Sequence, residues 1–281
     1  MLTLLRFNSL LLAILALSST AQAAASIQVV SFNLYNRPYE RETRLKNAVQ
    51  TVKALQPDVL ALQEVSQGWI LPNDPLELFS SALSFHSARA WHETNWGIFK
   101  TGLATLSRFP IIHEEYHDFK DHDCWDYKGY LVTVLKTSDH DELGVINLHM
   151  ASTSSESTRT SEWRELMETI NQQPTTRPLL VIGDFNTDPQ HPVMQEFTAA
   201  TGMKSIYDQN PELRKKATWT PNYQDDCSVP TPAGPTWDDH ATVLDFAFVR
   251  GAEIKNGSIV APTLVPHPSD HCPISMEMGW K

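Results

Sequence analysis

The sequence has no run of lysine and arginine longer than three residues, few cysteines, and no long apolar stretch beyond its first residues. Acidic side chains outnumber basic ones by 33 to 22, and the formal net charge is −11 at pH 7. An acidic protein without a basic patch repels a phosphate backbone, so the composition argues against a stable nucleic-acid partner. A bound divalent cation could reverse the local charge, so nucleic acid as a substrate stays open.

The cysteine content excludes a zinc site of the usual cysteine-rich kind. Only Cys124, Cys227 and Cys272 are present, and no two of them have the close spacing of zinc ligands. Export would permit a disulfide bond, but three cysteines cannot all pair within one chain. The spacing does not say which two would pair, and we expect at least one buried thiol.

The apolar stretch near the N-terminus is too short to span a membrane. It runs from Leu10 to Leu17, follows an arginine, and precedes Ala21-Gln22-Ala23, which has the small-x-small pattern of a cleavage site. A membrane-spanning helix needs about 20 apolar residues, whereas this layout is typical of a secretory signal peptide. We therefore expect a signal peptide at 1–23, a single domain at 24–281, and a secreted or periplasmic mature protein.

Strands and helices alternate in the first half of the chain, whereas later strands follow each other directly. Apolar and β-branched runs predict the strands, and apolar positions at helical spacing predict the helices. Residues 207–241, rich in proline, aspartate and tryptophan, are predicted to form one long irregular loop. The order predicts a mixed α/β sandwich, with strands at 26–33, 58–65, 102–111, 129–137, 144–150, 178–186, 242–250 and 272–278, and helices at 40–55 and 155–170.

Polar residues that could bind a metal or a phosphate stand at the ends of most of these strands. Ligands of layered α/β folds bind where strand ends converge, and residues two apart in a strand share a face. Each such residue alone could be an ordinary turn former. Their recurrence favours one shared site built from Asn33, Glu64, His149, Asp184, Asn186, Asp245, Asp270 and His271.

The donor atoms of this set are carboxylate, carboxamide and imidazole, without thiolate. Oxygen ligands suit Mg²⁺ or Ca²⁺ rather than zinc. Two histidines and several carboxylates around a hard cation fit hydrolysis of a phosphate ester, because the metal neutralises phosphoryl charge and a His–Asp pair activates water. The pattern predicts a metal-dependent hydrolase of phosphate esters.

Short motifs follow one another along residues 26–278, in the order SFNLY, ALQEV, GLATLSRFPI, NLHM, GDFN, LDFAFV and SDHCPI. Together they resemble the motif series of the deoxyribonuclease I-like endonuclease/exonuclease/phosphatase superfamily. The resemblance implies a four-layer α/β sandwich, with two packed mixed β-sheets flanked by helices. It also implies that 24–281 is one catalytic domain with its site at one edge of the sheets.

The resemblance implies a metal site made of Glu64, Asn33 and Asp270. Glu64 would be the main ligand, with Asn33 beside it and Asp270 close to the ion. The implied cofactor is Mg²⁺, with Mn²⁺ or Co²⁺ as substitutes.

The resemblance also implies the catalytic roles. His271 would be the general base, oriented by Asp245. Asp184 would orient the attacking water or position a second ion, and Asn186 would donate to the phosphoryl oxygens. His149, which the phosphodiesterase branches carry after Asn-Leu, would stabilise charge developing on phosphorus or assist the leaving group.

The segment DCWDYKGYLVTV places Asp123 five residues before Lys128, with a glycine next. This spacing resembles the Asp-x4-Lys-Gly element of neutral sphingomyelinases. Such a lysine can bind a phosphate or pair with an acid, although a surface turn before a strand would explain the same residues. A second segment, KATWTPN, resembles an element of bacterial sphingomyelinases, with Thr220 in place of its acidic residue and Asn222 following.

These resemblances predict a secreted sphingomyelinase that releases phosphocholine and leaves ceramide, by in-line attack of activated water. Lys128, Asp123 and Asn222 would bind the phospholipid substrate at a membrane surface. We expect a monomer. The alternatives are a secreted deoxyribonuclease I-like nuclease, a phospholipid or phosphoinositide phosphatase, and a non-catalytic binding module on the same fold.

Overall fold

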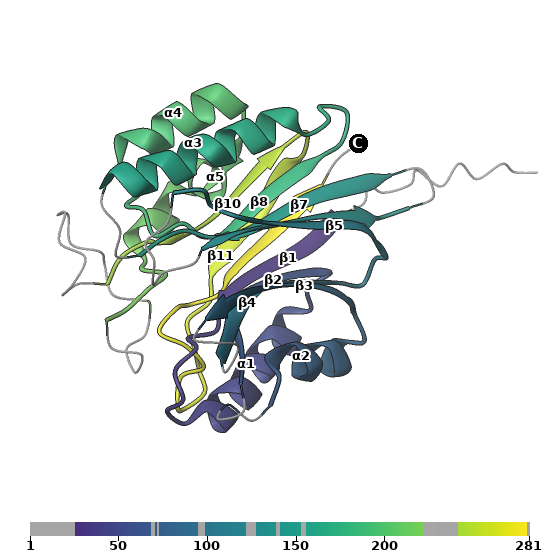
Figure 1. Cartoon of the computed structure of the whole chain (residues 1–281), viewed down its shortest axis with the longest axis vertical. Helices are drawn as coiled ribbons and strands as arrows, with labels where there is room; N and C mark the ends of the chain where they lie inside the picture. Colours follow the sequence, from purple (N-terminus) through teal and green to yellow (C-terminus); the bar gives the residue numbers. More distant parts are fainter. Residues whose placement is uncertain are drawn as a thin grey trace, which may run out of the picture.

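Two six-stranded mixed sheets lie face to face between two layers of helices (Figure 1). The computed structural model describes residues 26–68, 71, 73–94, 99–121, 128–138, 141–152, 156–221, 227 and 241–279. The predicted four-layer α/β sandwich is confirmed. The predicted signal peptide at 1–23 lies outside the described residues.

The first sheet has the strand order β11-β12-β1-β2-β4-β3, in which β1 and β2 are parallel. Helices α1 (Arg41–Leu55) and α2 (Pro75–Leu83) cover its outer face. Its strands are β1 (Ser26–Asn33), β2 (Val59–Gly68), β3 (His86–Thr94), β4 (Phe99–Ser107), β11 (Glu253–Ile259) and β12 (Ile274–Gly279).

The second sheet has the order β5-β6-β7-β8-β10-β9, in which β7 and β8 are parallel. Helices α3 (Glu156–Gln172) and α4 (Pro192–Thr201) cover its outer face. Its strands are β5 (Ile111–Asp118), β6 (Gly129–Lys136), β7 (Glu142–His149), β8 (Leu179–Asp184), β9 (Lys204–Ser205) and β10 (Asp245–Arg250). A short helix α5 (Ile206–Gln209) and a 3₁₀ helix η2 (Pro211–Lys215) follow β9.

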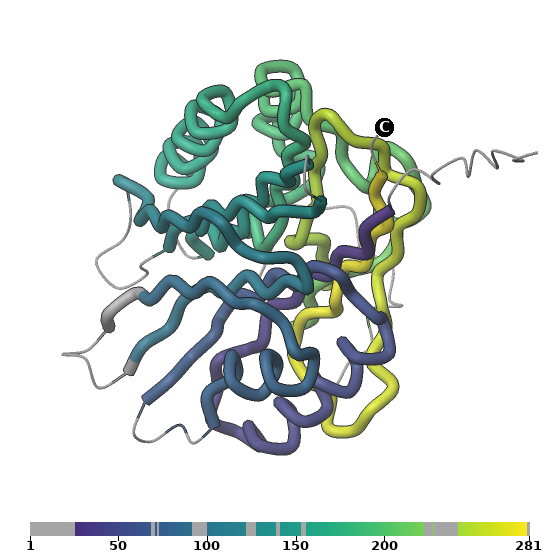
Figure 2. The backbone as a smooth tube through the Cα atoms, turned by 90° about the vertical axis from the view of Figure 1, so that its right-hand side faces the viewer, coloured from purple at the N-terminus to yellow at the C-terminus, as the bar shows by residue number. Residues whose placement is uncertain are grey.

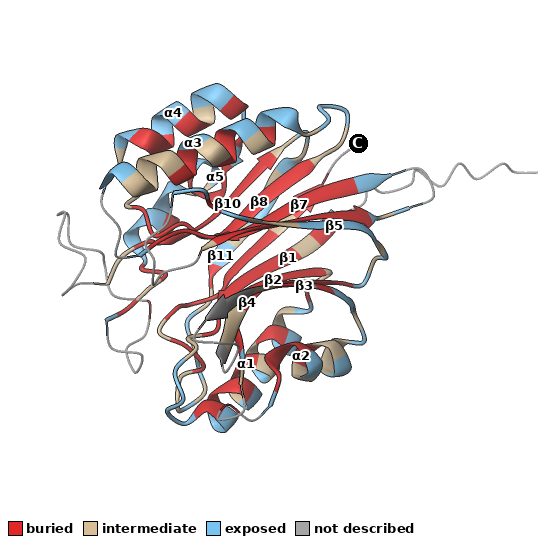
Figure 3. Cartoon of the chain, viewed as in Figure 1, coloured by how far each residue is buried: buried red, intermediate tan, exposed pale blue. Residues whose placement is uncertain are grey.

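The central strands read as continuous apolar runs because both of their faces are covered. Buried residues fill the space between the sheets and line the inner faces of the helices (Figure 3). Under α3 and α4, an aromatic cluster joins Trp163, Phe185, Phe197 and Phe248, with ring centroids 4.8 to 5.4 Å apart. Burial of each ring contributes roughly 1.5–3 kcal/mol, which anchors both helices to the sheet.

The first and last strands lie side by side in the first sheet (Figure 2). They are antiparallel, and their register runs from Ser26 opposite Gly279 to Ser31 opposite Ile274. The end of β1 therefore lies next to the start of β12. This pairing brings Asn33 and His271 to one edge of the molecule although most of the sequence separates them.

Three predicted segments differ from the structure. The strand predicted at 58–65 continues to Gly68 through a bulge. The strand predicted at 102–111 ends at Ser107, and Ile111 already belongs to β5. Residues 206–215 are helical rather than irregular, because the Ser205 side chain and Asp208 form a capping box that starts α5.

No helix in the described part of the chain is long and apolar enough to cross a membrane. The sequence analysis did not predict α2, α4, β3, β5, β9 or β11. β5 is an edge strand with largely exposed side chains, so it lacks the alternating pattern that reveals a half-buried strand.

Candidate active site

Three of the predicted site residues form one row across the second sheet. His149 ends β7, Asp184 ends β8 and Asp245 begins β10; the register pairs His149 with Asp184, and Asp184 with Asp245. Neighbouring strands lie roughly 4.8 Å apart, so the ladder itself sets the spacing of these side chains. His149 Nε2 lies 3.3 Å from Asp184 Oδ2. All three residues are buried.

Asn33, at the end of β1, connects this row to the first sheet. Its Nδ2 donates to Asp184 Oδ2 over 3.0 Å and faces Glu64 Oε1 at 3.4 Å. Its Oδ1 accepts the backbone N–H of Tyr35 at 3.1 Å. The two sheets therefore deliver Asn33, Glu64 and Asp184 to one place, as the strand-end pattern predicts.

Glu64 reaches the site through a β-bulge in β2. Leu62 still pairs with Ala104 and Val65 with Gly102, but the register shifts between these pairs. Glu64 takes a left-handed conformation with φ of 52°, which is costly for a residue with a side chain. The carboxylate is held by the backbone N–H of Asn36, which donates to Oε2 over 2.8 Å.

Asn147 satisfies the carbonyls that the bulge disturbs. This fully buried side chain of β7 donates to Leu62 O over 3.1 Å and to Ala104 O over 2.9 Å. Its Oδ1 accepts from Gln63 Nε2 at 2.8 Å. Asn147 thus crosses between the two sheets directly behind Glu64. Sequence reasoning missed this role, although Asn147 lies in the NLHM motif.

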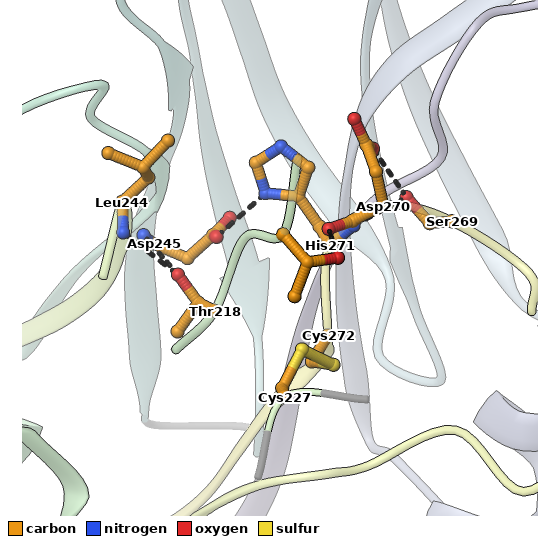
Figure 4. Close-up of a disulfide and its surroundings, with 9 residues drawn as sticks. Thr218, Cys227, Leu244, Asp245, Ser269, Asp270, His271 and Cys272 are labelled. Atoms are coloured by element: carbon orange, nitrogen blue, oxygen red, sulfur yellow. Dashed lines mark hydrogen bonds and ion pairs between the residues drawn. A yellow bond between two sulfur atoms is a disulfide. The ribbon is translucent and has the colours of Figure 1, made fainter. Parts of the chain in front are cut away.

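His271 and Asp245 form a buried pair (Figure 4). His271 Nδ1 lies 2.8 Å from Asp245 Oδ2, and His271 Nε2 lies 3.7 Å from Asp184 Oδ2. A carboxylate at Nδ1 fixes the ring and leaves Nε2 facing the site. Thr218 Oγ1 accepts the backbone N–H groups of Leu244 and Asp245 at 2.9 and 3.0 Å, which holds the start of β10.

Asp270 lies next to His271, and its carboxylate accepts from Trp219 Nε1 over 3.2 Å. Ser269 Oγ faces the other oxygen at 3.3 Å. The backbone of Trp219 forms bridges to Thr242 and to His271. Trp219 lies in the KATWTPN segment, and its indole N–H holds a predicted metal ligand, a role that the sequence did not indicate.

Asn186 lies close to the row of His149, Asp184 and Asp245, and its side chain is hydrogen-bonded to the backbone. Its Nδ2 donates to Met150 O over 2.8 Å, and its backbone N–H donates to Asp184 Oδ1 over 3.0 Å. The amide nitrogen carries two N–H groups, so the bond to Met150 O is compatible with donation to phosphoryl oxygens, which stays a prediction.

Lys128, the residue directly before β6, joins the site. Its Nζ lies 3.1 Å from Nε2 and 3.4 Å from Nδ1 of His149. A side chain on the next residue, Gly129, would collide with the carbonyl of His117, so close strand packing requires this glycine. The other two predicted substrate-binding residues, Asp123 and Asn222, lie outside the described residues.

A disulfide joins Cys227 to Cys272, with Cα atoms 6.3 Å apart. Both cysteines are buried, and Cys272 directly follows His271 (Figure 4). The bond therefore ties residue 227 to the strand segment that carries the histidine. The sequence left this pairing open, and Cys124 lies outside the described residues.

Opposite charges compete with burial throughout the site. Burial would raise the pKa of Asp184, but His149 and His271 lower it well below its ordinary value. Burial would also raise the pKa of Glu64, yet His149, Lys128 and the Asn36 amide lower it. Both carboxylates are therefore ionised at neutral pH and available to a cation.

Three other groups of the site, Asp245, Asp270 and His271, shift in the direction of protonation, and for Asp245 it is burial that raises the pKa. Burial would lower the pKa of His271, but Asp245 and Asp184 outweigh it and raise that pKa to about 10. Burial raises the pKa of Asp270 to about 6 despite the nearby His271. The excess of carboxylates keeps His271 protonated until further positive charge enters the site.

Residues 30–271 match the model of the Endonuclease/Exonuclease/phosphatase family. The chain belongs to this family. The Escherichia coli K12 protein YbhP, itself described as uncharacterized, is 28% identical over 272 residues that cover 88% of this chain and 91% of YbhP. Members of the family are typically metal-dependent hydrolases of phosphodiester bonds.

Solved structures of family proteins share the fold. An endonuclease/exonuclease/phosphatase from Beutenbergia cavernae superposes with a TM-score of 0.69 at 18% identity, covering 91% of this chain and 72% of that one. TDP2 of D. rerio, in complex with a single-strand DNA product, gives 0.69 at 16% identity, with 91% and 99% covered. At these identities the likeness concerns the fold.

The chemistry of the site fits the divalent ion that this family uses. Asp184, Asp245 and His271 offer ligand atoms within 4.8 Å of one another. Because Asp245 already faces His271 Nδ1, the predicted ligands Glu64 and Asp270 give the more accessible oxygens, with the amide of Asn33 between Glu64 and Asp184. Such oxygen-rich sets suit hard cations.

Proposed function

We propose that the protein is an exported, metal-dependent phosphodiesterase that hydrolyses sphingomyelin to ceramide and phosphocholine. One observation carries the hydrolytic part, the convergence of six side chains through direct contacts: Asn33, Glu64, His149, Asp184, Asp245 and His271. This set contains an ionised carboxylate cluster for a cation and an oriented imidazole for water.

Different residues of the site would bind the cation and accept the proton of the attacking water. When held by Glu64, Asn33 and Asp270, a divalent cation would neutralise phosphoryl charge and offset the carboxylates that raise the pKa of His271. His271 Nε2 then accepts the proton of the attacking water, while Asp245 keeps the proton on Nδ1.

The leaving group departs on the opposite side of phosphorus. As the bond from phosphorus to the ceramide oxygen breaks, negative charge grows on that oxygen. The ammonium group of Lys128, 3.1 Å from Nε2 of His149, supplies positive charge that would stabilise it, and the His149 ring lies beside it. Asp184 holds His149 through the 3.3 Å contact and so keeps it directed into the site.

Two features support a lipid rather than a nucleic-acid substrate. Lys128 belongs to the segment that resembles the neutral sphingomyelinases, and its ammonium group lies at the site rather than on a distant turn. The net charge of −11 disfavours a long polyanion, whereas a zwitterionic lipid headgroup carries no net charge.

A nuclease is the second candidate, and the TDP2 neighbour with its single-strand DNA product motivates it. That neighbour shares 16% identity, so it supports the fold and leaves the substrate to experiment.

A substrate panel tests the proposal. Purified mature protein would be offered sphingomyelin, phosphatidylcholine, lysophosphatidylcholine and plasmid DNA, each with Mg²⁺ and with EDTA. We expect release of phosphocholine from sphingomyelin in mixed micelles, dependent on Mg²⁺ and abolished by His271→Ala. Metal-dependent nicking of DNA without release of phosphocholine would replace the lipid substrate by nucleic acid. Hydrolysis of none would exclude a phosphodiesterase.

A further inference from the structure

Arg44 is one of the largest fully buried side chains of the protein, although its helix faces solvent on the opposite side. All five N–H groups of a guanidinium can donate, and none can accept. In Arg44 each finds a backbone carbonyl: Nε donates to Tyr39 O at 2.9 Å, Nη1 to Leu34 O at 3.4 Å and Pro268 O at 3.1 Å, and Nη2 to Tyr35 O at 3.1 Å and Arg37 O at 2.6 Å.

These carbonyls belong to the two loops that flank the site. Residues 34–40 connect β1 to α1 and follow Asn33, while Pro268 precedes the segment with Asp270 and His271. The two loops meet beside α1 at the lower corner of the view (Figure 1). Asn47 Nδ2 adds a bond to Pro266 O over 2.8 Å, so α1 holds the second loop at two points.

The bonds of Arg44 and those of the site share the same peptide units. In a trans peptide the C=O and N–H point in opposite directions. The unit between Leu34 and Tyr35 gives its C=O to Arg44 and its N–H to Asn33 Oδ1. The unit between Tyr35 and Asn36 gives its C=O to Arg44 and its N–H to Glu64 Oε2.

The backbone holds only part of this arrangement, through the Arg37 N–H, which donates to Tyr35 O over 2.8 Å. Tyr35 has a φ of 52°, in the left-handed region that residues with side chains avoid. Rotation of either peptide plane would turn a carbonyl oxygen toward Asn33 or Glu64 and remove the N–H that now orients it. The guanidinium opposes this rotation because each carbonyl turned away would leave a buried N–H without an acceptor.

We propose that Arg44 is a positioning residue that fixes these two peptide planes and thereby presents Asn33 and Glu64 to the divalent ion. The inference rests on the proposed metal-dependent function for its effect on catalysis. The effect on the peptide planes is independent of it. A lysine keeps the charge but has three donors on a flexible stem, so it cannot serve all five carbonyls.

Arg44→Lys tests the inference, with Leu45→Ala as the matched control. Leu45 is the next residue of α1 and is buried in the core under the first sheet, so its truncation loosens the helix without touching the carbonyls. Arg44→Gln is the second variant, should Arg44→Lys fail to fold. Three readouts apply: hydrogen exchange of the Tyr35 and Asn36 amides, calorimetric titration with Mn²⁺, and separate kcat and KM values on the substrate identified by the panel.

In Arg44→Lys we expect the Tyr35 and Asn36 amides to exchange at least tenfold faster than in Leu45→Ala. Mn²⁺ affinity should fall about 10- to 100-fold, as when outer-shell partners of metal ligands are lost, and kcat should fall more than KM rises. Exchange and Mn²⁺ affinity equal to those of Leu45→Ala would overturn the inference.

The remaining outcomes are also decisive. If neither Arg44 variant folds while Leu45→Ala does, Arg44 is a determinant of folding and the positioning role is rejected. If the native protein binds no Mn²⁺ and hydrolyses no phosphodiester, the proposed function fails, while exchange of the Tyr35 and Asn36 amides still decides the role of Arg44.

Discussion

The two sheets supply the site by different means. The second sheet contributes His149, Asp184 and Asp245 from paired positions of a regular ladder. The first sheet contributes Asn33 and Glu64 from the end of a strand and from a bulge, with left-handed residues at 35 and 64. We call His149, Asp184 and Asp245 the ladder half of the site, and Asn33 and Glu64 the bulge half. Backbone hydrogen bonds position the ladder half, whereas buried polar side chains must position the bulge half.

The difference predicts where the site is fragile. In the ladder, each residue is held by its neighbours in the sheet, and loss of one side-chain bond leaves the backbone in place. At the bulge, the conformation depends on Asn147 and on the Asn36 amide. Single changes that affect Asn33 or Glu64 should therefore disturb ligand geometry more than comparable changes around His149, Asp184 and Asp245.

The largest effect is expected for His271→Ala, which removes the proposed general base. Loss of a general base should lower kcat by about 10²- to 10⁴-fold with the fold retained. Steady-state kinetics measure this, with His113→Ala on the exposed strand β5 as the control. A variant that keeps near-native turnover would remove His271 from the mechanism.

The next effect concerns pH in the absence of metal. The pKa of His271 is raised to about 10, above its unfolded value of about 6.5, so the folded state holds the extra proton between these values. The stability that this charge contributes is complete below pH 6.5 and is lost as the pH rises to 10, by up to about 5 kcal/mol.

Urea unfolding in EDTA between pH 6 and 10 measures this loss. In His271→Gln, which cannot carry the proton, stability should change much less over the same range. Parallel curves for the two proteins would contradict an ion pair between His271 and its two aspartates.

A smaller effect is expected for Asn147→Ala, which tests the support of the bulge. The change removes the hydrogen-bond donor to the carbonyls of Leu62 and Ala104 and leaves a cavity between the sheets. It should lower the free energy of unfolding by about 4 kcal/mol. Mn²⁺ affinity should fall as well, because Glu64 loses its fixed backbone. Thr133→Val, another buried polar change in the second sheet, serves as the control. Unchanged Mn²⁺ affinity in Asn147→Ala would show that the bulge needs no such support.

The smallest effect is expected for Thr218→Val in the ladder half. It removes the acceptor for the amides of Leu244 and Asp245 and should cost about 2 kcal/mol. Because the β8–β10 register also holds Asp245, Mn²⁺ affinity should stay near native, and Thr218→Ser should restore the stability. A loss of Mn²⁺ affinity as large as that of Asn147→Ala would erase the contrast between the two halves.

The ladder half could be predicted from the sequence. The strands that carry His149, Asp184 and Asp245 are apolar runs that end or begin at a polar residue. Such runs are recognisable because both faces of the strand are buried. The family resemblance, now supported by the match over residues 30–271, also gave the layered architecture and the residues to examine.

The features that position Asn33 and Glu64 could not be predicted from the sequence. A bulge depends on the partner strand, which the local sequence does not contain. Arg44 lies in a polar helix, where an arginine reads as solvent-exposed, and only the two loops that close over it explain its burial. The Cys227–Cys272 pair likewise depends on tertiary proximity.

The most direct test is a crystal of the native protein soaked with Mn²⁺ and examined by anomalous scattering. A single strong peak is expected within bonding distance of a Glu64 oxygen and next to Asn33 and Asp270, the ligands that the first sheet and the segment before β12 supply. A peak held by Asp184, Asp245 and His271 away from Glu64, or the absence of a peak beside Glu64, would contradict the account.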